Sequence, residues 1–275
     1  MNLHRRSLAA AALSLMACAS PAWSQLSEPP GAAAADYVPD EGQPGKDVIW
    51  LPTAQSLVER MLALAKLTPR DHLIDLGSGD GRLVITAAQR GATAHGIEYN
   101  PDLVAYAQRA AASAGVSDRA TFEKADIFES DFSKATVITM FLLPDLNLRL
   151  RPTLLDMKPG TRIVSNSFGM GDWEPDETVA VKEDCSTYCN AYKWTVPAKV
   201  AGTWRFGDSE LVLTQTFQKI AGTLREAGSA RPISEAHVNG ARIGFVVGGQ
   251  RFSGEVDGSR IRGTVDGKPW RATRR

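Results

Sequence analysis

An acid and a set of alternating glycines follow directly on one short apolar run. The run and its turn read Leu73-Ile-Asp-Leu-Gly-Ser-Gly-Asp-Gly-Arg82. Glycine has no Cβ, so the backbone of such a turn can approach a bound ligand closely. In an open α/β sheet, ligands bind at the carboxyl ends of the strands, which is where this turn would lie. The spacing therefore predicts a ligand cradle formed by Asp75, Gly77, Ser78, Gly79 and Gly81.

The charge of the turn indicates which ligand it binds. A dinucleotide fingerprint, Gly-x-Gly-x-x-Gly, would require glycine at position 82, where this chain has Arg82. The Asp75 carboxylate suits a cation better than the pyrophosphate of a dinucleotide. S-adenosylmethionine presents both an ammonium and a sulfonium cation, and it is therefore the cofactor that we expect.

Two further acids stand where the other parts of this cofactor would lie. Glu98 ends the second expected strand, where a carboxylate can accept hydrogen bonds from both ribose hydroxyls. Asp126 follows the third strand and can accept from the adenine amine, while Ile127 packs against the adenine face. Each acid alone could equally be a helix cap or a solvated carboxylate, but three acids at successive strand ends, together with the glycines, favour the cofactor site.

Strands and helices that alternate over short connections position these residues. Apolar residues at helical spacing predict a helix that Thr53 caps and that ends before Pro69. Strict alternation with short connections predicts a doubly wound, Rossmann-like parallel sheet, and a hairpin over 178–182 and 191–196 would form its antiparallel edge. The other expected strands are 72–76, 93–98, 120–124, 136–141 and 162–166, and the helices are 81–90, 101–114 and 146–157.

After Pro197 the pattern changes to short alternating segments separated by turns such as Asn239-Gly240 and Asp257-Gly258. This pattern predicts a small all-β meander or barrel. The expected strands are 202–206, 210–215, 218–224, 234–239, 242–247, 251–256, 260–265 and 270–273. The whole chain is then divided into a signal peptide (1–24), a flexible linker (25–47), the cofactor-binding domain (48–196) and the β-domain (197–275).

The N-terminus indicates export. Arg5 and Arg6 precede an apolar stretch that is too short to span a membrane, and Ala22-Trp-Ser24 is typical of a signal-peptide cleavage site. We expect a periplasmic or cell-envelope protein; lipid anchoring at Cys18 and an uncleaved cytosolic start are the alternatives.

The remaining composition restricts the partners. Lys+Arg and Asp+Glu are both 31, so no strong field favours nucleic acid, and no run after the N-terminus is long enough to span a membrane. Cys185 and Cys189 are either bridged across a tight turn or two free thiols. The 4 histidines show no ligand spacing around them, so no metal site is expected.

Residues 48–178 resemble class I S-adenosylmethionine-dependent methyltransferases, and more closely the ATP synthase c-subunit lysine methyltransferase family with its bacterial relatives. Beyond the glycine loop, the similar stretches are Trp50-Leu-Pro-Thr53, Gly96-Ile-Glu-Tyr-Asn-Pro101, Phe141-Leu-Leu-Pro144, Leu148-Arg-Leu-Arg-Pro152 and Met170-Gly-Asp-Trp173. The resemblance implies that Thr53, Tyr99 and Asn100 join the residues above in holding the cofactor, and that the acceptor pocket is lined by Phe141, Leu142, Pro144 and Trp173.

The resemblance implies methyl transfer, with a protein lysine as the expected acceptor. Because the sulfonium is already activated, the enzyme mainly aligns acceptor, methyl and sulfur, and an apolar pocket would help the lysine to arrive neutral. No residue is assigned as a general base. A small-molecule methyltransferase and a non-catalytic envelope binding protein on the same scaffold are the alternatives.

Overall fold

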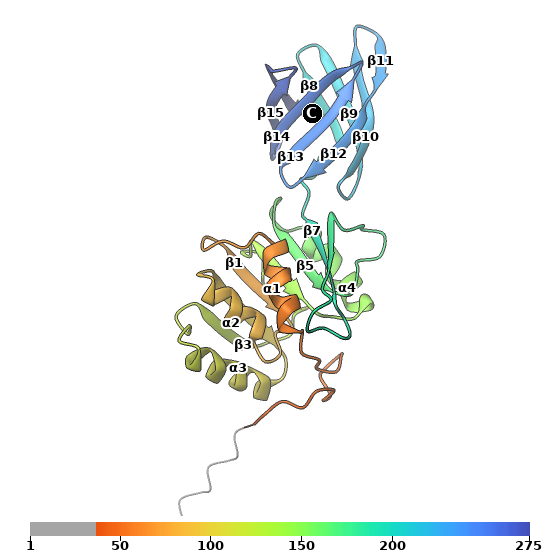
Figure 1. Ribbon diagram of the computed structural model, residues 1–275. Helices are drawn as coiled ribbons and strands as arrows, with labels where there is room; N and C mark the ends of the chain where they lie inside the picture. Colours follow the sequence, from red (N-terminus) through yellow and green to blue (C-terminus); the bar gives the residue numbers. More distant parts are fainter. Residues whose placement is uncertain (1–36) are drawn as a thin grey trace, which may run out of the picture. The chain divides into compact units, whose positions relative to one another are not determined.

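The computed structural model describes residues 37–275, which form an α/β domain followed by a β-barrel (Figure 1). The α/β domain contains a seven-stranded sheet in the order β3-β2-β1-β4-β5-β7-β6. Its strands are β1 (His72–Leu76), β2 (Thr93–Glu98), β3 (Ala120–Lys124), β4 (Val137–Met140), β5 (Arg162–Asn166), β6 (Glu177–Ala180) and β7 (Asn190–Thr195), and its helices are α1 (Gln55–Leu64), α2 (Arg82–Gln89), α3 (Pro101–Ser113) and α4 (Pro144–Leu155).

The sheet has a parallel centre and an antiparallel edge. Strands β1 to β5 pair in parallel, whereas β7 runs antiparallel to β5 and β6 antiparallel to β7. The expected doubly wound sheet with an antiparallel edge hairpin is thereby confirmed. This order places the carboxyl ends of β3, β2, β1, β4 and β5 along one edge of the sheet, which is where a ligand site is expected.

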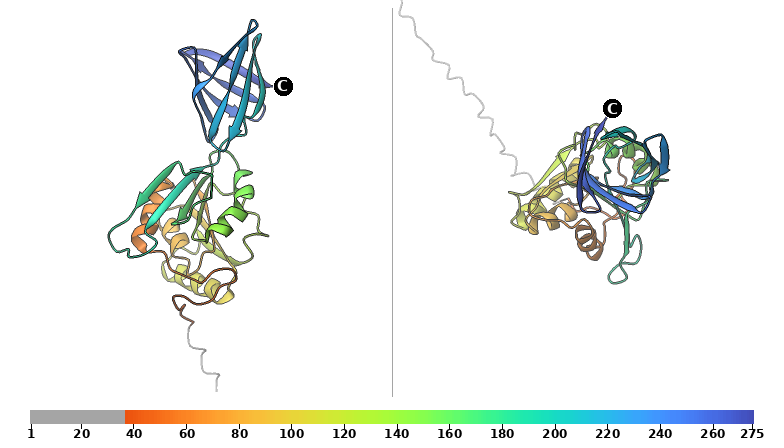
Figure 2. Two further views of the ribbon diagram at one scale, coloured as in Figure 1. Left: turned by 90° about the vertical axis from the view of Figure 1, so that its right-hand side faces the viewer. Right: turned by 90° about the horizontal axis from the view of Figure 1, so that it is seen from above.

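Successive strand residues serve two separate cores, because side chains alternate between the faces of a sheet. Leu73 and Val137 pack with α1, α2 and α3 on one face. Their neighbours Ile74 and Ile138 pack with α4 on the other. Figure 2 shows α1 (orange) and α4 (green) on opposite sides of the sheet.

Two helix starts differ from the expected positions. Helix α1 begins after Ala54, and no side chain caps it. The Thr53 hydroxyl instead accepts a hydrogen bond from Asn166 Nδ2 at 3.2 Å, so a tertiary contact replaces the expected cap. Helix α4 begins at Pro144 rather than near 146, because proline fits the first helical turn without losing a hydrogen bond.

The C-terminal strands close into an antiparallel barrel, as expected. In chain order they are β8 (Gly202–Phe206), β9 (Ser209–Thr216), β10 (Lys219–Glu226), β11 (Ser229–Pro232), β12 (Ser234–Asn239), β13 (Arg242–Val247), β14 (Gln250–Asp257), β15 (Arg260–Val265) and β16 (Lys268–Arg274). Strand β16 pairs with β8 and β9 with β10, which closes eight strands into a ring. Buried Trp204, Phe245, Phe252 and Trp270 help to fill the interior. Strand β11 was not expected; it is short, mostly exposed and ends in proline, which is typical of an edge strand.

The described part of the expected linker is folded. Within residues 37–54, Gly42 N donates to Trp50 O at 2.9 Å and Trp50 N donates to Gln43 O at 2.9 Å. We call residues 43–53 the N-terminal strap. The prediction of a flexible linker up to residue 47 is therefore wrong for residues 37–47. Backbone hydrogen bonds to Trp50 and the hydrogen bond from Lys46 to Asp126 order a segment that has no periodic pattern.

The expected signal peptide lies outside the described residues. Among the residues described, no helix has the length and apolar character needed to cross a membrane.

Candidate active site

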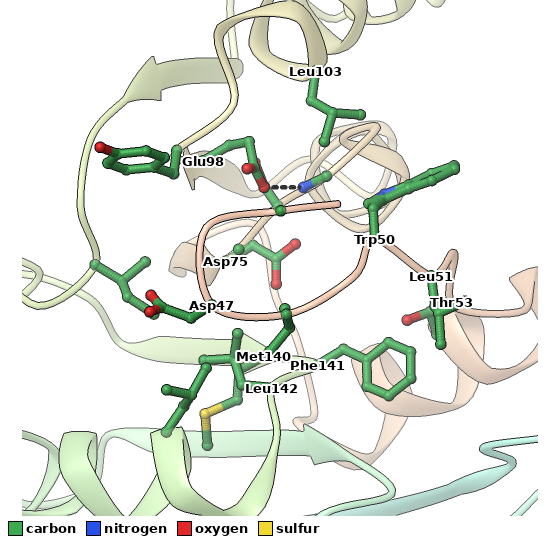
Figure 3. A pocket seen from close by; sticks show the side chains of 18 of the residues that line it. Asp47, Trp50, Leu51, Thr53, Asp75, Glu98, Leu103, Met140, Phe141 and Leu142 are labelled. Carbon is green, nitrogen blue, oxygen red and sulfur yellow. Dashed lines mark hydrogen bonds between the residues drawn. The ribbon is translucent and has the colours of Figure 1, made fainter. Parts of the chain in front are cut away.

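A cavity of about 220 Å³ opens at the carboxyl ends of the central strands. It lies where the three acids and the glycine loop were expected to meet. The lining includes most of the predicted site residues: Thr53, Asp75, Gly77, Ser78, Gly79, Glu98, Tyr99, Asp126, Ile127, Phe141 and Leu142. Figure 3 shows Asp75 and Glu98 from β1 and β2 within this cavity, with Trp50, Phe141 and Leu142 around them.

Asp75, the penultimate residue of β1, is the most deeply buried acid of the site. It is 6% exposed, and its Oδ1 accepts a hydrogen bond of 2.7 Å from Thr139 Oγ1 on β4. The pKa of the carboxyl is raised to about 7. Burial is the main cause, and the nearby Glu98 and Asp80 add to it, while the hydrogen bond from Thr139 partly opposes it. A buried carboxylate without a cationic partner is costly, so this position favours a positively charged ligand.

Cofactor affinity should therefore depend on pH. Because Asp75 titrates near pH 7, its carboxylate is lost below that value, and the dissociation constant for S-adenosylmethionine should rise up to about tenfold for each pH unit between 7 and 5.5. Calorimetric titration across this range measures the effect. Thr139→Val removes the hydrogen bond that stabilises the carboxylate and should move the midpoint to higher pH; a midpoint common to both proteins would contradict this assignment.

Glu98 and the glycine loop hold each other in place. Gly79 N donates to Glu98 Oε2 at 3.0 Å, drawn in Figure 3, and Asn100 N donates to Glu98 Oε1 at 2.9 Å. The carboxylate is thus fixed at the end of β2, where ribose hydroxyls can use its remaining lone pairs.

The strap supplies a wall that sequence reasoning missed. The Trp50 ring lies so close to the glycine loop that a Cβ at Gly79 would stand 2.3 Å from Trp50 Nε1. Arg82 joins the two segments, since its Nη1 donates to Thr53 O at 2.8 Å while its Nε and Nη2 bind the Asp80 carboxylate. Arg82 therefore holds the strap against the glycine loop, a role that the sequence analysis did not assign to it.

Asp126, the expected adenine partner, pairs with a lysine of the strap. Lys46 Nζ hydrogen bonds to Asp126 Oδ2, and Phe128 N donates to Oδ1 at 2.9 Å. The bond from Lys46 is the main reason why the pKa of Asp126 lies below its usual value. An adenine amine on this carboxylate would share it with Lys46, whose ammonium also lies 5.0 Å from the centre of the Tyr99 ring.

Four predicted site residues do not line the cavity. Trp173, expected in the acceptor pocket, is 1% exposed and packs against Trp194 at 6.1 Å between ring centres; it belongs to the core beneath α4, so this prediction is wrong. Pro144 is exposed at the first turn of α4. The Asn100 side chain caps α3 by accepting from Asp102 N at 2.9 Å. A Cβ at Gly81 would meet Phe122 and Ala107, so this glycine serves helix packing.

Two aromatic residues missed in the sequence line the cavity beside Phe141. Phe168 follows β5, and Tyr188 comes from the connection between β6 and β7. The ring centres lie 6.2 Å (Phe141 to Phe168), 5.3 Å (Phe141 to Tyr188) and 5.7 Å (Phe168 to Tyr188) apart. We call Phe141, Phe168 and Tyr188 the aromatic wall. No spacing in the sequence links the three, because they meet only once β4, β5 and the edge hairpin are assembled.

The residues present fit S-adenosylmethionine. Asp126, Glu98 and Asp75 follow one another along β3, β2 and β1, which matches an adenine, a ribose and a cationic amino acid in that order. The glycine loop leaves room for a close ligand at Gly79, between Glu98 and Trp50. The aromatic wall lies beyond β1, at the ends of β4 and β5 and in the connection between β6 and β7, so a methyl acceptor would approach from that side.

Comparisons with known proteins agree with this geometry. Residues 75–177 match the family model described as the ANTKMT methyltransferase domain. A protein-lysine N-methyltransferase of Saccharolobus islandicus is 42% identical over 139 residues, which are 50% of this chain and 86% of that protein. The mouse lysine N-methyltransferase of the ATP synthase c-subunit is 35% identical over 130 residues, which are 47% of this chain. The match covers only 52% of the length of that enzyme.

A solved structure extends the likeness to the fold. The crystal structure of an RNA methyltransferase from Salinibacter ruber, in complex with S-adenosyl-L-homocysteine, shares 47% sequence identity with a TM-score of 0.51. The match covers 55% of this chain and 96% of that chain. That structure holds the demethylated form of the cofactor that the three acids and the glycine loop were expected to bind.

The sheet order and the acidic, glycine-lined cavity define a class I S-adenosylmethionine-dependent methyltransferase. The chain belongs to the methyltransferase family that includes the Saccharolobus protein-lysine enzyme and is related to the lysine methyltransferases of the ATP synthase c-subunit and of the adenine nucleotide translocase.

Proposed function

We propose that this chain methylates lysine side chains of a protein. The observation that carries the proposal is the aromatic wall beyond β4, on the side of Asp75 away from Glu98 and Asp126. An apolar wall suits the alkyl stem of lysine and lowers the pKa of its amine. Relatives at 42% and 35% identity are lysine methyltransferases, which supports the same acceptor here.

The rim of the cavity supports a macromolecular acceptor. Ile49, Tyr99, Leu143 and Tyr188 line the cavity, yet each is at least 44% exposed. Large apolar side chains gathered around one opening are typical of a surface that docks another protein. A free amino acid would bury little of this rim, so the proposal is that a polypeptide covers it.

The chemistry places few demands on the protein. S-adenosylmethionine supplies an electrophilic methyl group, which the nitrogen lone pair of the acceptor takes while the carbon–sulfur bond breaks. Asp75 and Glu98 would fix the donor, and the aromatic wall would align the amine and keep water away. Alignment of this kind is the main source of rate in a displacement whose electrophile is already activated.

We also propose that the chain works in an oxidising compartment such as the periplasm or cell envelope. The support is the disulfide between Cys185 and Cys189, because such bonds persist mainly outside the reducing cytosol. Trapping free thiols in the protein as it exists in cells tests this; two thiols that react without prior reduction would contradict it.

Methyl transfer from tritiated S-adenosylmethionine tests the proposed acceptor. The purified chain is incubated with a cell-envelope extract, and labelled protein is hydrolysed to amino acids. Label in methyl-lysine is the expected result. Label confined to a small-molecule fraction would favour the alternative enzyme class, and label in RNA would favour the activity named for the Salinibacter structure. The Asp75→Asn variant controls for contaminating enzymes.

A further inference from the structure

The connection between β6 and β7 carries a small covalent ring at the mouth of the cavity. Cys185 and Cys189 are joined by a disulfide with Cα atoms 5.8 Å apart, and the ring encloses Tyr188. The base of the connection is also tied to the sheet, since Val181 N donates to Cys189 O at 2.9 Å and Ser167 N donates to Asn190 O at 2.8 Å. The second bond places the loop beside the residue that precedes Phe168.

Tyr188 has a backbone conformation that needs such support. Its φ is +56°, in the left-handed region that bulky residues rarely adopt. A residue held in this region persists when its surroundings over-determine it. Here the disulfide to the adjoining Cys189 and the two ring contacts, with Phe141 and Phe168, supply that constraint.

The place of Tyr188 along the sheet assigns it to the acceptor side. The donor's expected partners end at β1, and the aromatic wall follows at β4, β5 and the edge hairpin. Aromatic faces around an amine bind its cationic, methylated form through cation–π attraction and its alkyl stem through apolar contact. Tyr188 is 44% exposed, so part of its ring is open to an incoming group.

We propose that Tyr188 is a specificity-determining residue of the acceptor pocket and that the Cys185–Cys189 disulfide holds it in place. The inference rests on the proposed function, because it assigns to that acceptor site an alkylamine or alkylammonium ligand. Opening the disulfide would release Tyr188 from the aromatic wall while leaving Asp75, Glu98 and the glycine loop untouched. Acceptor recognition would then depend on the redox state of the chain, and cofactor binding would not.

Steady-state methylation of poly-L-lysine by the full chain tests the proposal. Tyr188→Ala should raise the acceptor KM about tenfold and leave the S-adenosylhomocysteine dissociation constant within about twofold of the original. Tyr188→Phe keeps the ring and should rescue most of the KM increase seen with Tyr188→Ala. Tyr106→Ala, on α3 and outside the cavity lining, is the control for loss of a tyrosine.

The disulfide is tested in the same assay. The double variant Cys185→Ser/Cys189→Ser, and the unmodified chain after reduction, should both reproduce the KM increase of Tyr188→Ala. Added reductant should have no further effect on the double variant. An unchanged KM in these proteins, or an equal loss of S-adenosylhomocysteine binding, would overturn the proposal, the latter by showing a merely structural role.

A binding measurement separates this inference from the proposed function. Tetramethylammonium is titrated into the chain saturated with S-adenosylhomocysteine and observed by NMR line broadening. Tyr188→Ala and the double cysteine variant should weaken its binding, and Tyr188→Phe should not. If poly-L-lysine is not methylated but this pattern holds, the lysine proposal fails and the aromatic site stands. If Tyr188→Ala binds the cation as the unmodified chain does, the inference fails.

Discussion

Asp75→Asn should weaken S-adenosylmethionine binding by about 30-fold to several thousand-fold, since truncating one side of a buried charge pair costs roughly 2–5 kcal/mol. The side chain is buried and hydrogen bonded to Thr139, and asparagine retains the shape and that hydrogen bond while losing the charge. Isothermal titration with the cofactor measures the change. If the dissociation constant of the variant stays within threefold of that of the unmodified chain, the Asp75 carboxylate does not contribute to cofactor recognition.

When neither protein has ligand bound, Asp75→Asn should be more stable than the unmodified chain. Burial raises the pKa of Asp75 from 3.8 to about 7, so its contribution to stability is fully present below pH 3.8 and is lost as the pH rises through 7. The advantage of Asp75→Asn should therefore grow by about 1.4 kcal/mol per pH unit over this window and then level off. Thermal unfolding at pH 5, 6, 7 and 8 shows whether it does.

Asp71, the residue just before the start of β1, provides a matched control. Burial disfavours its charge, but the bonds from Arg162, Thr136 and Thr68 still hold the pKa of this carboxyl below its usual value. Asp71→Asn should accordingly lower the melting temperature at neutral pH and leave cofactor affinity unchanged. Opposite signs of the stability change at two acids beside one strand would separate a structural carboxylate from a ligand-binding one.

Gly79→Ala is expected to have the second large effect, on both binding and stability. Gly79 has φ +53°, and an added Cβ would stand 2.3 Å from Trp50 Nε1. The Trp50 ring or the loop must move, which disturbs the bond from Gly79 N to Glu98. We expect cofactor affinity to fall at least about 100-fold and stability to fall by about 1–3 kcal/mol, measured by calorimetry and thermal unfolding.

Gly115→Ala separates backbone strain from the clash. Gly115 has φ +69°, but nothing lies within 4 Å of the added Cβ. This variant should lose about 1 kcal/mol of stability and keep full cofactor affinity. Trp50→Ala in the Gly79→Ala background should recover part of the lost stability. If Gly115→Ala and Gly79→Ala proved indistinguishable, the contact between the strap and the loop would have no measurable role.

The cofactor half of the site could be predicted because its signals are local. Asp75, Glu98 and Asp126 each lie at or close to the carboxyl end of a strand, and the topology of a parallel sheet brings such ends together. The barrel strands could be predicted for the same reason, from turn residues between alternating segments.

The acceptor half could be predicted only in part, because it depends on contacts between distant segments. Phe168 and Tyr188 meet Phe141 through the pairing of β5 with β7, which no spacing reveals. Trp173 was misplaced because its assignment to the acceptor pocket rested on the family resemblance alone, whereas the structure buries it against Trp194. The strap lacks any hydrophobic period, and its order comes from Arg82 and the glycine loop.

The ring of strands in the C-terminal domain has a consequence for biosynthesis. Strand β8 pairs with the next strand, β9, along one edge and with β16 along the other. Its second edge therefore stays unpaired until residues 268–274 have left the ribosome. The strands of the α/β sheet, all of which precede β8, have no such requirement. During translation the catalytic domain can therefore fold first, while the unfinished barrel presents an open β-edge that chaperones would have to protect.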